Sequence, residues 1–343
     1  MFYIRADANE IIGTGHVMRC LSISEELRRQ GEEVTFIIAD KRTEKMVVEK
    51  GFQVICLDSV WNDLDKEIEK VLKVIEEYGI SLLLIDSYYV TEKYLNTLRK
   101  YIKIAYIDDL NQFIYPVDYL INYNIYAEHL DYLNRYRQVG LSDTEFLLGC
   151  SYTPLRTEFT RIHRDINDKV SKILITSGGT DNYNAVANIL ETLFARQWFP
   201  QMEYYVILGR FNIHKSELEE RWRENKNIHL LSNVDNIADY MKLCDIAITA
   251  GGVTTYELCA CGIPSVMYTL ADNQFQIART VSEQNLIPWI GDVREDMDAC
   301  MDRLVQVIED MKDDVEKRKK ISHTMQKIVD GEGCRRLVQI ITD

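Results

Sequence analysis

The sequence predicts an α/β protein built from two domains, each a parallel sheet covered by helices. Three observations support this fold class. The 343 residues exceed the usual size of a single core. Short apolar runs alternate with amphipathic helical stretches in two successive series, the pattern of parallel sheets with crossover helices. A glycine-rich turn also follows the first predicted strand of each series.

The first series occupies the amino-terminal half of the chain. Its predicted strands are rich in aliphatic or β-branched residues and cover 2–6, 33–38, 52–56, 82–86, 102–107 and 119–122. Its predicted helices carry apolar residues at helical spacing and cover 17–29, 44–50, 63–78 and 92–100.

The alternation stops between Ser151 and Asn167, where a proline and a charged run intervene. We therefore expect an amino-terminal domain of residues 1–155 and a carboxy-terminal domain of residues 156–343. The second series contains predicted strands 172–176, 204–208, 228–231, 246–249 and 265–268. It also contains predicted helices 183–196, 215–225, 237–243, 254–261 and 274–284, with a last helix at 334–341.

Charge and composition exclude several classes of protein. The formal net charge of -14 opposes binding to nucleic acid or to an anionic membrane, and residues 1–157 share this acidic balance. The start of the chain lacks a signal-peptide pattern, and no segment reaches the roughly 20 apolar residues of a membrane span. The eight cysteines are scattered without a paired framework. We expect a cytoplasmic protein with reduced thiols and no stable membrane insertion.

A histidine follows the first glycine turn, Gly13-Thr14-Gly15, at the start of a predicted helix. Ligands of open parallel sheets bind beyond the carboxyl ends of the strands, so His16 can reach a bound substrate. An imidazole with a reference pKa of about 6.5 can accept a proton from water or an alcohol near neutral pH. The turn lacks the third glycine of a dinucleotide fingerprint, and no P-loop occurs, which disfavours dehydrogenases and P-loop phosphotransferases.

The second glycine turn is Ser177-Gly178-Gly179-Thr180-Asp181, after the first strand of the second series. Its backbone N–H groups and the following helix start could cradle a diphosphate, with Asp181 or Asn182 as helix cap. The alternative for both turns is a purely structural role, since glycine suits any tight strand-to-helix connection. One such turn in each domain favours ligand binding.

Two further motifs follow strands of the second series. Gly251-Gly252 precedes a helix that contains Thr254 and Glu257, and Glu257 is a candidate acceptor for ribose hydroxyls. The alternative is an acid that only offsets the helix dipole. Ala271-Asp272-Asn273-Gln274 also lies at a strand end, where amide side chains suit sugar hydroxyl and N-acetyl groups. A helix cap is the alternative for at least one of these three polar residues.

Two acidic positions close strands of the first series. Asp86 is followed by Tyr88, a candidate catalytic residue together with His16 that could reach a sugar oxygen, and Asp108 is followed by Asp109. Each acid could belong to the active site, and Asp108 and Asp109 could also form a pair of metal ligands, whereas a loop or cap function is the common alternative. The chain contains no standard zinc or EF-hand spacing, so we expect neither a metal nor a cofactor.

Together these residues resemble the UDP-sugar hydrolases of pseudaminic acid biosynthesis. The resemblance extends over nearly the whole chain, and its most specific parts are the Gly-His turn and the Ala-Asp-Asn-Gln segment. The matching positions are Arg5-Ala6-Asp7, Gly13-x-Gly15-His16-x-x-Arg19, Asp86-x-Tyr88, Ile107-Asp108-Asp109, Gly178-Gly179-x-Asp181, Gly251-Gly252, Glu257 and Ala271-Asp272-Asn273-Gln274. The Gly-Gly…Glu block is shared with the peptidoglycan N-acetylglucosaminyltransferase and its wider GT-B relatives.

The resemblance implies a GT-B architecture, with two Rossmann-like domains facing across a cleft. It implies that the second domain holds UDP and that the sugar faces His16, with the last helix returning to the first domain. The family releases UDP from UDP-2,4-diacetamido-2,4,6-trideoxy-β-L-altropyranose. By analogy, His16 activates water for inverting attack at the anomeric carbon, without an obligatory metal, and Ser177–Asp181 stabilises the departing diphosphate.

Two alternatives remain open at this stage. A glycosyltransferase would use the same histidine to deprotonate an acceptor hydroxyl, although the acidic first domain disfavours a lipid-linked acceptor. A non-catalytic nucleotide-sugar binding protein would retain Glu257 and Gly251-Gly252 and would have no need for His16. Related proteins also serve spore-coat and other surface-polysaccharide pathways, so the UDP moiety follows more directly from the residues than the sugar does.

Overall fold

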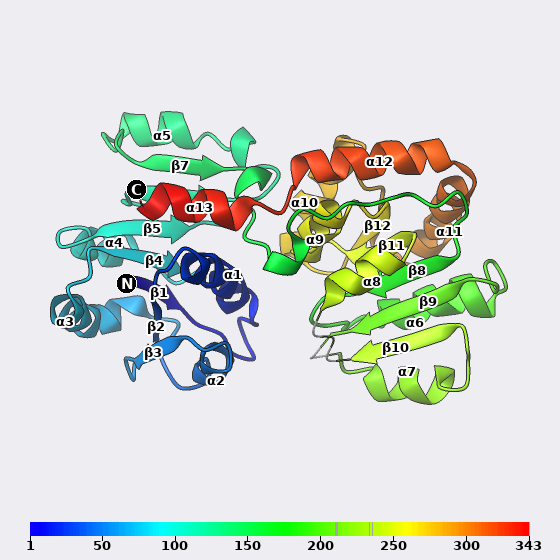
Figure 1. Ribbon diagram of the computed structural model, residues 1–343, viewed down its shortest axis with the longest axis horizontal. Helices are drawn as coiled ribbons and strands as arrows, with labels where there is room; N and C mark the ends of the chain where they lie inside the picture. Colours follow the sequence, from blue (N-terminus) through cyan, green and yellow to red (C-terminus); the bar gives the residue numbers. More distant parts are fainter. Residues whose placement is uncertain (210–211, 233, 235, 343) are drawn as a thin grey trace. The chain divides into compact units, whose positions relative to one another are not determined.

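The computed structural model describes residues 1–209, 212–232, 234 and 236–342. The chain forms two compact units (Figure 1). Unit 1 consists of Met1–Thr157 together with Glu332–Asp343, and unit 2 consists of Glu158–Gly331. The carboxy-terminal segment therefore belongs to the same unit as the amino terminus.

Unit 1 contains a seven-stranded sheet in the described part of the chain, in the order β3-β2-β1-β4-β5-β6-β7. All neighbouring strands are parallel. The strands are β1 (Phe2–Ala6), β2 (Val34–Ile38), β3 (Gln53–Cys56), β4 (Leu82–Asp86), β5 (Lys103–Ile107), β6 (Tyr119–Asn122) and β7 (Glu145–Leu148). The order reverses at β1 and β4, which places the loops after these two strands at a topological switch point.

The helices of unit 1 connect these strands and cover the sheet. They are α1 (Gly15–Arg29), α2 (Glu44–Val48), α3 (Ile68–Tyr78), α4 (Glu92–Leu98), α5 (Tyr132–Gln138) and α13 (Gly333–Thr342), with a 3₁₀ turn at Leu64–Glu67 before α3. Helix α13 packs against α1 (Figure 1). Its apolar residues Leu337, Val338 and Ile341 are buried, so the last helix of the chain completes the core of unit 1.

Unit 2 contains a six-stranded parallel sheet among its described residues, in the order β10-β9-β8-β11-β12-β13. Its strands are β8 (Lys172–Thr176), β9 (Glu203–Leu208), β10 (Ile228–Ser232), β11 (Ile246–Ala250), β12 (Ser265–Thr269) and β13 (Trp289–Asp292). Its helices are α6 (Ala185–Leu190), α7 (Lys215–Trp222), α8 (Ile237–Leu243), α9 (Thr254–Cys261), α10 (Asp272–Glu283), α11 (Met297–Asp313) and α12 (Val315–Ile328). A π-helical segment, Glu191–Ala195, continues α6.

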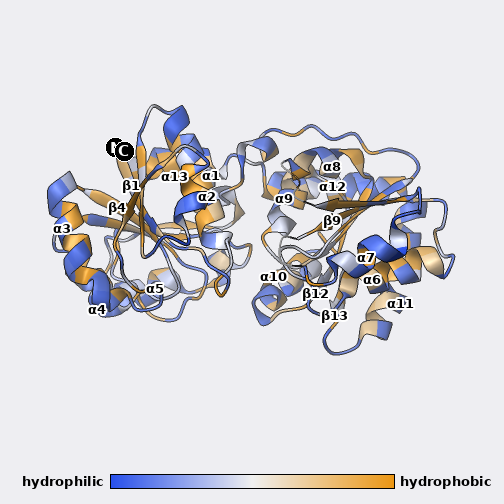
Figure 2. Cartoon of the chain, turned by 90° about the horizontal axis from the view of Figure 1, so that it is seen from below, coloured by the Kyte–Doolittle hydropathy of each residue, from blue (hydrophilic) through white to orange (hydrophobic). Residues whose placement is uncertain are grey.

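The cores lie between the sheets and their helices. Strands β1, β2 and β11 are buried along their whole length, as expected when helices cover both faces of a parallel sheet. Figure 2 shows apolar residues concentrated in the strands, whereas helices such as α3 carry one apolar and one polar side. This packing fixes the carboxyl ends of the strands, where the candidate site residues lie.

The predicted two-series α/β pattern is confirmed, with most elements within two residues of their expected bounds. The expected helix 183–196 begins at Ala185 and changes to π-helix at Glu191. Elements β7, α5, β13, α11 and α12 were not predicted from the sequence. Strand β7 is only four residues long and half-buried, so its pattern is weak without its neighbour β6.

Candidate active site

His16 and Asp86 form a buried pair at the switch point of unit 1. His16 lies in the first turn of α1, and Asp86 ends β4 beside β1. His16 Nδ1 is 2.6 Å from Asp86 Oδ1. His16 is 5% exposed and Asp86 is 1% exposed. Two residues separated by 70 positions are thus held in contact by the parallel pairing of β1 and β4.

Arg19, one turn further along α1, holds the other side of this pair. Its Nε and Nη2 donate to Asp86 Oδ2 and Oδ1, each at 2.6 Å. Its Nη1 donates to Asp109 Oδ2 at 2.6 Å and to the Tyr123 hydroxyl at 2.7 Å. The guanidinium is buried, and its donors are directed at protein groups. Although burial alone would lower the pKa of Arg19, Asp109 and Asp86 raise it well above the ordinary value.

The charge on Asp86 determines the tautomer of His16. Burial by itself would raise the pKa of Asp86, but the nearby Arg19 and His16 hold this pKa well below its usual range. The ionised carboxylate accepts, so Nδ1 of His16 carries the proton and Nε2 is the basic nitrogen. Arg19 Nη2 also lies 3.2 Å from Nδ1, but this contact is secondary because the same nitrogen donates to Asp86 at 2.6 Å.

Tyr88 lies beside His16 in the loop after β4. The two ring centroids are 4.4 Å apart, with the planes at 78°. The Tyr88 hydroxyl donates to Asp109 Oδ2 at 3.2 Å, and Asn124 donates to Asp109 Oδ1 at 3.2 Å. Burial and the charge of Asp109 raise the pKa of Tyr88 far above its ordinary value, so the phenol stays protonated. The expected residues His16, Arg19, Asp86 and Tyr88 therefore come together.

Asp108 has a different environment from this cluster. Its Oδ1 accepts the backbone N–H groups of Leu110 and Asn111, and its Oδ2 accepts the Tyr132 hydroxyl at 2.5 Å. Burial raises the pKa of Asp108 against the effect of these donors. The contacts of Asp108 stabilise the loop after β5, whereas Asp109 contacts the His16 cluster.

A second buried ionic cluster, which we call the Arg5 clamp, consists of Arg5, Asp7 and Glu67. Arg5 Nε and Nη2 donate to Glu67 Oε1 and Oε2 at 2.7 and 2.9 Å. Arg5 Nη1 donates to Asp7 Oδ2 at 2.6 Å, and Asp7 Oδ1 accepts the backbone N–H of Ala39 at 2.8 Å. Arg5 and Glu67 are fully buried. The clamp joins the carboxyl end of β1 to the end of β2 and to the turn before α3.

The segment from the clamp to His16 is held by further local bonds. The Ala8 N–H donates to Thr43 Oγ1 at 2.9 Å, and the Thr43 hydroxyl donates to the Ala8 carbonyl at 3.1 Å. Asn9 pairs with Gly13, which has a φ of +72° that favours glycine. Gly15 begins α1 directly before His16. The Gly13–Gly15 turn thus leads from a rigid strand end to the imidazole.

In unit 2, the Ser177–Asp181 turn follows β8. Gly178 has a φ of +77°, and its N–H donates to Thr176 Oγ1 at 3.2 Å. Asp181 is fully buried, and its carboxylate accepts the N–H groups of Ala185 and Val186 at 2.8 and 3.0 Å. Burial raises the pKa of Asp181. The sequence predicts that backbone N–H groups at the start of this helix bind a diphosphate. Two of them, those of Ala185 and Val186, instead donate to Asp181.

Gly251 and Gly252 lie between β11 and α9. A Cβ on Gly251 would lie 3.1 Å from Met267 Sδ and 3.4 Å from Gln274 Cβ, so the glycine lets the neighbouring α10 approach. Helix α9 begins at Thr254 without a side-chain cap. Thr254 and Glu257 are half-buried in its first turns. An uncapped helix start is a suitable environment for an anion.

The Ala271–Gln274 segment begins α10 after β12. The Gln274 side-chain oxygen accepts the N–H of Leu270 at 2.9 Å, which fixes the turn. Asp272 is exposed and pairs with Arg294 at 2.7 Å. Asn273 is exposed. Strands β8, β11 and β12 are adjacent, so these residues share one sheet edge with the Ser177 and Gly251 turns.

Three buried hydroxyls at this edge have no hydrogen-bond partner within the described residues: Ser177 Oγ, Thr255 Oγ1 and the Tyr268 hydroxyl. Burial raises the pKa of Tyr268 well above its ordinary value, and the charge of Asp181 adds to this shift. Buried polar groups are normally paired. The unpaired hydroxyls are consistent with a polar ligand at the carboxyl edge of unit 2.

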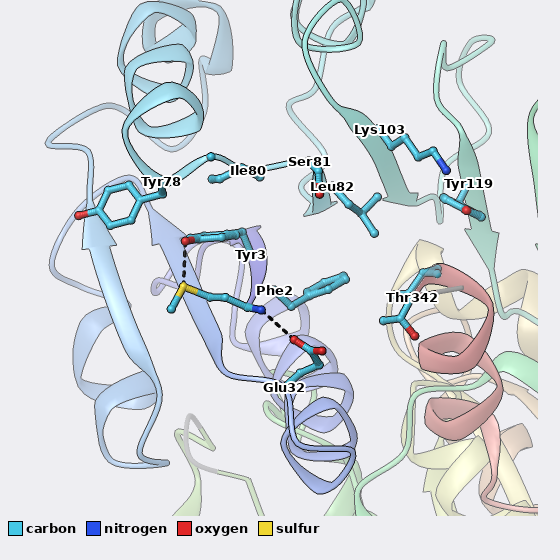
Figure 3. Close-up of a pocket in the computed structure, with 13 residues that line it drawn as sticks. Phe2, Tyr3, Glu32, Tyr78, Ile80, Ser81, Leu82, Lys103, Tyr119 and Thr342 are labelled. Carbon is cyan, nitrogen blue, oxygen red and sulfur yellow. Dashed lines mark hydrogen bonds and ion pairs between the residues drawn. The ribbon is translucent and has the colours of Figure 1, made fainter.

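A cavity of about 670 Å³ lies at the opposite edge of the unit 1 sheet (Figure 3). Its lining includes Tyr3, Ser81, Lys103 and Tyr119 near the amino ends of β1, β4, β5 and β6. The Met1 ammonium donates to Glu32 at 2.8 Å, and the Tyr3 hydroxyl donates to Met1 Sδ at 2.9 Å. Ligands of such sheets bind at the carboxyl edge, so we do not place the reaction in this cavity.

Sequence reasoning missed several residues of these clusters as site residues. Tyr123 and Asn124 follow the end of β6, and the rule that selected Asp86 and Asp109 also applies to them. Glu67 follows no strand, and only the fold brings it to Arg5. Tyr268 lies at the end of a predicted apolar strand, where its hydroxyl gives no separate signal.

Across the ranges that the structure describes, no helix is long and apolar enough to span a bilayer. The same ranges contain no group of three or more His, Cys, Asp or Glu side chains placed to hold a metal ion. All eight cysteines are free thiols.

Comparison with known proteins places these observations in context. Residues 172–331 match the glycosyltransferase family 28 C-terminal domain. An uncharacterized protein of Methanocaldococcus jannaschii, MJ1062, is 29% identical over 286 residues, which cover 80% of this chain and 56% of that protein. The chain thus spans little more than half the length of this relative.

Two other relatives have more informative names. The spore coat polysaccharide biosynthesis protein SpsG of Bacillus subtilis is 23% identical, over 99% of this chain and 97% of its own length. A UDP-2,4-diacetamido-2,4,6-trideoxy-beta-L-altropyranose hydrolase of Campylobacter jejuni is 27% identical, over 69% of this chain and 80% of its own length.

Among solved structures, MurG of Acinetobacter baumannii superposes with a TM-score of 0.68 at 13% identity. The match covers 99% of this chain and 98% of that one. The fold is therefore of the GT-B type, with two parallel-sheet α/β domains, as the sequence predicted.

Proposed function

We propose that this protein hydrolyses a UDP-linked diacetamido-trideoxy sugar, releasing UDP and the free sugar by inverting attack of water at the anomeric carbon. The observation that carries the proposal is the 2.6 Å contact between His16 and Asp86 at the switch point of unit 1. The similarity to the Campylobacter jejuni hydrolase supports the substrate class. The product would enter nonulosonic acid or surface polysaccharide synthesis, in the cytoplasm, where free thiols persist.

His16 acts as the general base in this mechanism. Its Nδ1–H donates to Asp86, and its Nε2 accepts a proton from water as the water oxygen bonds to the anomeric carbon. The bond between that carbon and the phosphate oxygen breaks, and its electron pair leaves with UDP. Asp86 orients the imidazole and stabilises the imidazolium, as a buried carboxylate does in other histidine-based catalysts.

Arg19 acts as a positioning residue in this proposal. Its donors are directed at Asp86, Asp109 and Tyr123, and its guanidinium keeps Asp86 ionised. Tyr88 and the Gly13–Gly15 turn complete the surroundings of His16. Asp108 stabilises the loop after β5, at the carboxyl edge of the unit 1 sheet, by accepting the N–H of Leu110.

The carboxyl edge of unit 2 is proposed to bind the nucleotide. The start of α9, which has no side-chain cap, would receive the diphosphate beside Gly251, Gly252 and Thr254, and Glu257 would accept the ribose hydroxyls. The N–H groups of Gly251 and Gly252 already bond to the Tyr268 and Ala250 carbonyls, so these glycines would allow close approach and would not act as donors. Ser177, Gly178 and Gly179 would line the same edge, with Asp181 holding their turn. Asn273 and the Gln274 amide nitrogen would meet sugar oxygens, and Asp272 would act through its pair with Arg294.

A glycosyltransferase is the second candidate, favoured by the match of residues 172–331 to the glycosyltransferase family 28 C-terminal domain. Such an enzyme would use the same nucleotide site and the same base. The difference is the nucleophile, which would be an acceptor hydroxyl. His16 is 5% exposed, and this limited access favours water over a bulky acceptor.

The test is UDP release from UDP-2,4-diacetamido-2,4,6-trideoxy-β-L-altropyranose in EDTA, without added acceptor, for the wild type and His16→Ala. Release that depends on His16 supports a metal-independent hydrolase. UDP binding without release favours a transferase that lacks its acceptor, a hydrolase of another sugar or a non-catalytic binding protein. Equal release by both proteins would refute the base function of His16.

A further inference from the structure

The ring of Tyr88 packs edge-on against the His16 imidazole and is the more exposed of the two side chains. Tyr88 is 38% exposed, whereas His16 is 5% exposed and the ring centroids are 4.4 Å apart. Nδ1 of His16 is bonded to Asp86, so a nucleophile can give its proton only to Nε2. To reach Nε2 it must enter the space around the imidazole that the Tyr88 ring partly fills. Tyr88 is therefore placed to limit the size of that nucleophile.

The position of the Tyr88 ring is fixed at its far end. Its hydroxyl donates to Asp109 Oδ2, and Asp109 is held by Arg19 Nη1 and Asn124 Nδ2. Arg19 also holds Asp86, the partner of His16. The Arg19 guanidinium therefore holds His16 through Asp86 and the Tyr88 ring through Asp109. These bonds restrict movement of the ring relative to the imidazole. A ring without this attachment could rotate away from the imidazole.

We propose that Tyr88 is a specificity-determining residue that admits water to His16 and excludes larger hydroxyl compounds. This inference rests on the proposed hydrolysis and adds the reason for the choice of nucleophile. The chemistry is the same for both nucleophiles: the O–H proton goes to His16 Nε2, the oxygen bonds to the anomeric carbon, and UDP leaves with the electron pair. Water gives the free sugar, and an alcohol gives an alkyl glycoside.

The chain offers a matched control at the next position. Tyr89 belongs to the same loop, but its ring packs on Trp61, at a centroid distance of 5.1 Å. Tyr89→Ala removes the same volume as Tyr88→Ala and leaves the ring beside His16 in place. Tyr88→Phe keeps that ring and removes only the bond to Asp109.

The first experiment measures the ratio of alkyl glycoside to free sugar by mass spectrometry, with methanol or glycerol added to the UDP-sugar reaction. This ratio is internal to each reaction, so a slower variant is still informative. We expect a low ratio for the wild type and Tyr89→Ala, and a rise of at least tenfold for Tyr88→Ala. Tyr88→Phe should lie between them. A Tyr88→Ala ratio within twofold of the wild type, or an equal rise in Tyr89→Ala, would overturn the inference.

The second experiment needs no substrate. Diethyl pyrocarbonate modifies accessible unprotonated histidines, and peptide mapping reports the rate at His16. We expect at least a fivefold faster modification of His16 in Tyr88→Ala than in the wild type or Tyr89→Ala. An unchanged rate would overturn the shielding by Tyr88. If the wild type releases no UDP while this rate rises as expected, the proposed substrate is wrong and the shielding stands.

Discussion

His16 Nδ1 and Asp86 Oδ1 are 2.6 Å apart, although 70 positions separate the two residues. The contact exists because β1 and β4 are adjacent parallel strands whose carboxyl ends meet at one edge. It places the proton of the neutral imidazole on Nδ1 and leaves Nε2 as the nitrogen that can accept a proton. The predictions below test this pair and the structures that hold it.

His16→Gln should remove most of the catalysis and little of the nucleotide binding. A positioned general base contributes about 10²–10⁴-fold, so kcat for UDP release should fall by that amount. UDP affinity, measured by calorimetry, should stay within about threefold because no unit 2 residue changes. A parallel loss of UDP affinity would place His16 in nucleotide binding.

Asp86→Asn should destabilise the protein in a pH-dependent way. The folded pKa of Asp86 lies below its unfolded value, so its ionisation contributes stability that is complete above about pH 4 and is lost as the pH falls through the folded pKa. The urea midpoint of the variant should therefore lie below that of the wild type at pH 7, and the gap should narrow below about pH 4. Asp108 is present in both proteins, so its titration changes both urea midpoints equally and does not affect the gap between them. A gap that stays constant from pH 7 to pH 3 would contradict the assignment.

Glu67→Gln should break the Arg5 clamp. Removing one charge from a buried ion pair costs about 3–5 kcal/mol, since the buried guanidinium loses its bidentate partner. Urea unfolding monitored by circular dichroism measures the loss. Glu69→Gln is the matched control, because Glu69 is exposed on α3. Its midpoint should be unchanged, and equal midpoints for the two variants would show that the clamp contributes nothing.

Gly209→Ala should distort the carboxyl edge of the unit 2 sheet, where we propose that the nucleotide binds. A Cβ at Gly209 would lie 2.5 Å from the Gly179 carbonyl oxygen and still closer to that of Gly178. Overpacking of this kind costs about 1–3 kcal/mol and would displace the Ser177–Asp181 turn. We expect at least tenfold weaker UDP binding by calorimetry and a lower thermal midpoint.

Gly252→Ala is the control for thermal stability, because no atom lies within 4 Å of the added Cβ. Its midpoint should match that of the wild type. A Gly209→Ala protein with normal UDP affinity would show that the β8 turn does not take part in nucleotide binding.

The sequence predicted the alternation of strands and helices well because most elements are buried on predictable faces. His16, Asp86 and Tyr88 could be selected because each follows or ends an apolar strand, and strand ends are where ligands bind. The same rule did not separate Asp108 from Asp109. Their side chains point to different partners, Tyr132 and Arg19, and only tertiary packing decides this.

Other features could not be predicted because they depend on contacts between distant segments. Arg5 and Asp7 belong to the matching motif, but their partner Glu67 lies in a 3₁₀ turn without a recognisable signal. The sequence predicts Asp181 or Asn182 as the helix cap, and the structure selects Asp181. Its carboxylate does receive the first α6 amides, and this removes those amides from the set available to a ligand.

Unit 1 cannot finish folding until helix α13, at the end of the chain, has been synthesised. Unit 2 is an insertion within unit 1, since residues 158–331 separate the two segments that form the first unit. Helix α1, which begins beside His16, is covered by α13. On the ribosome, unit 2 can be completed while α1 still exposes its apolar side, because α13 is translated later. The half of the molecule that is made first is therefore the half that finishes folding last.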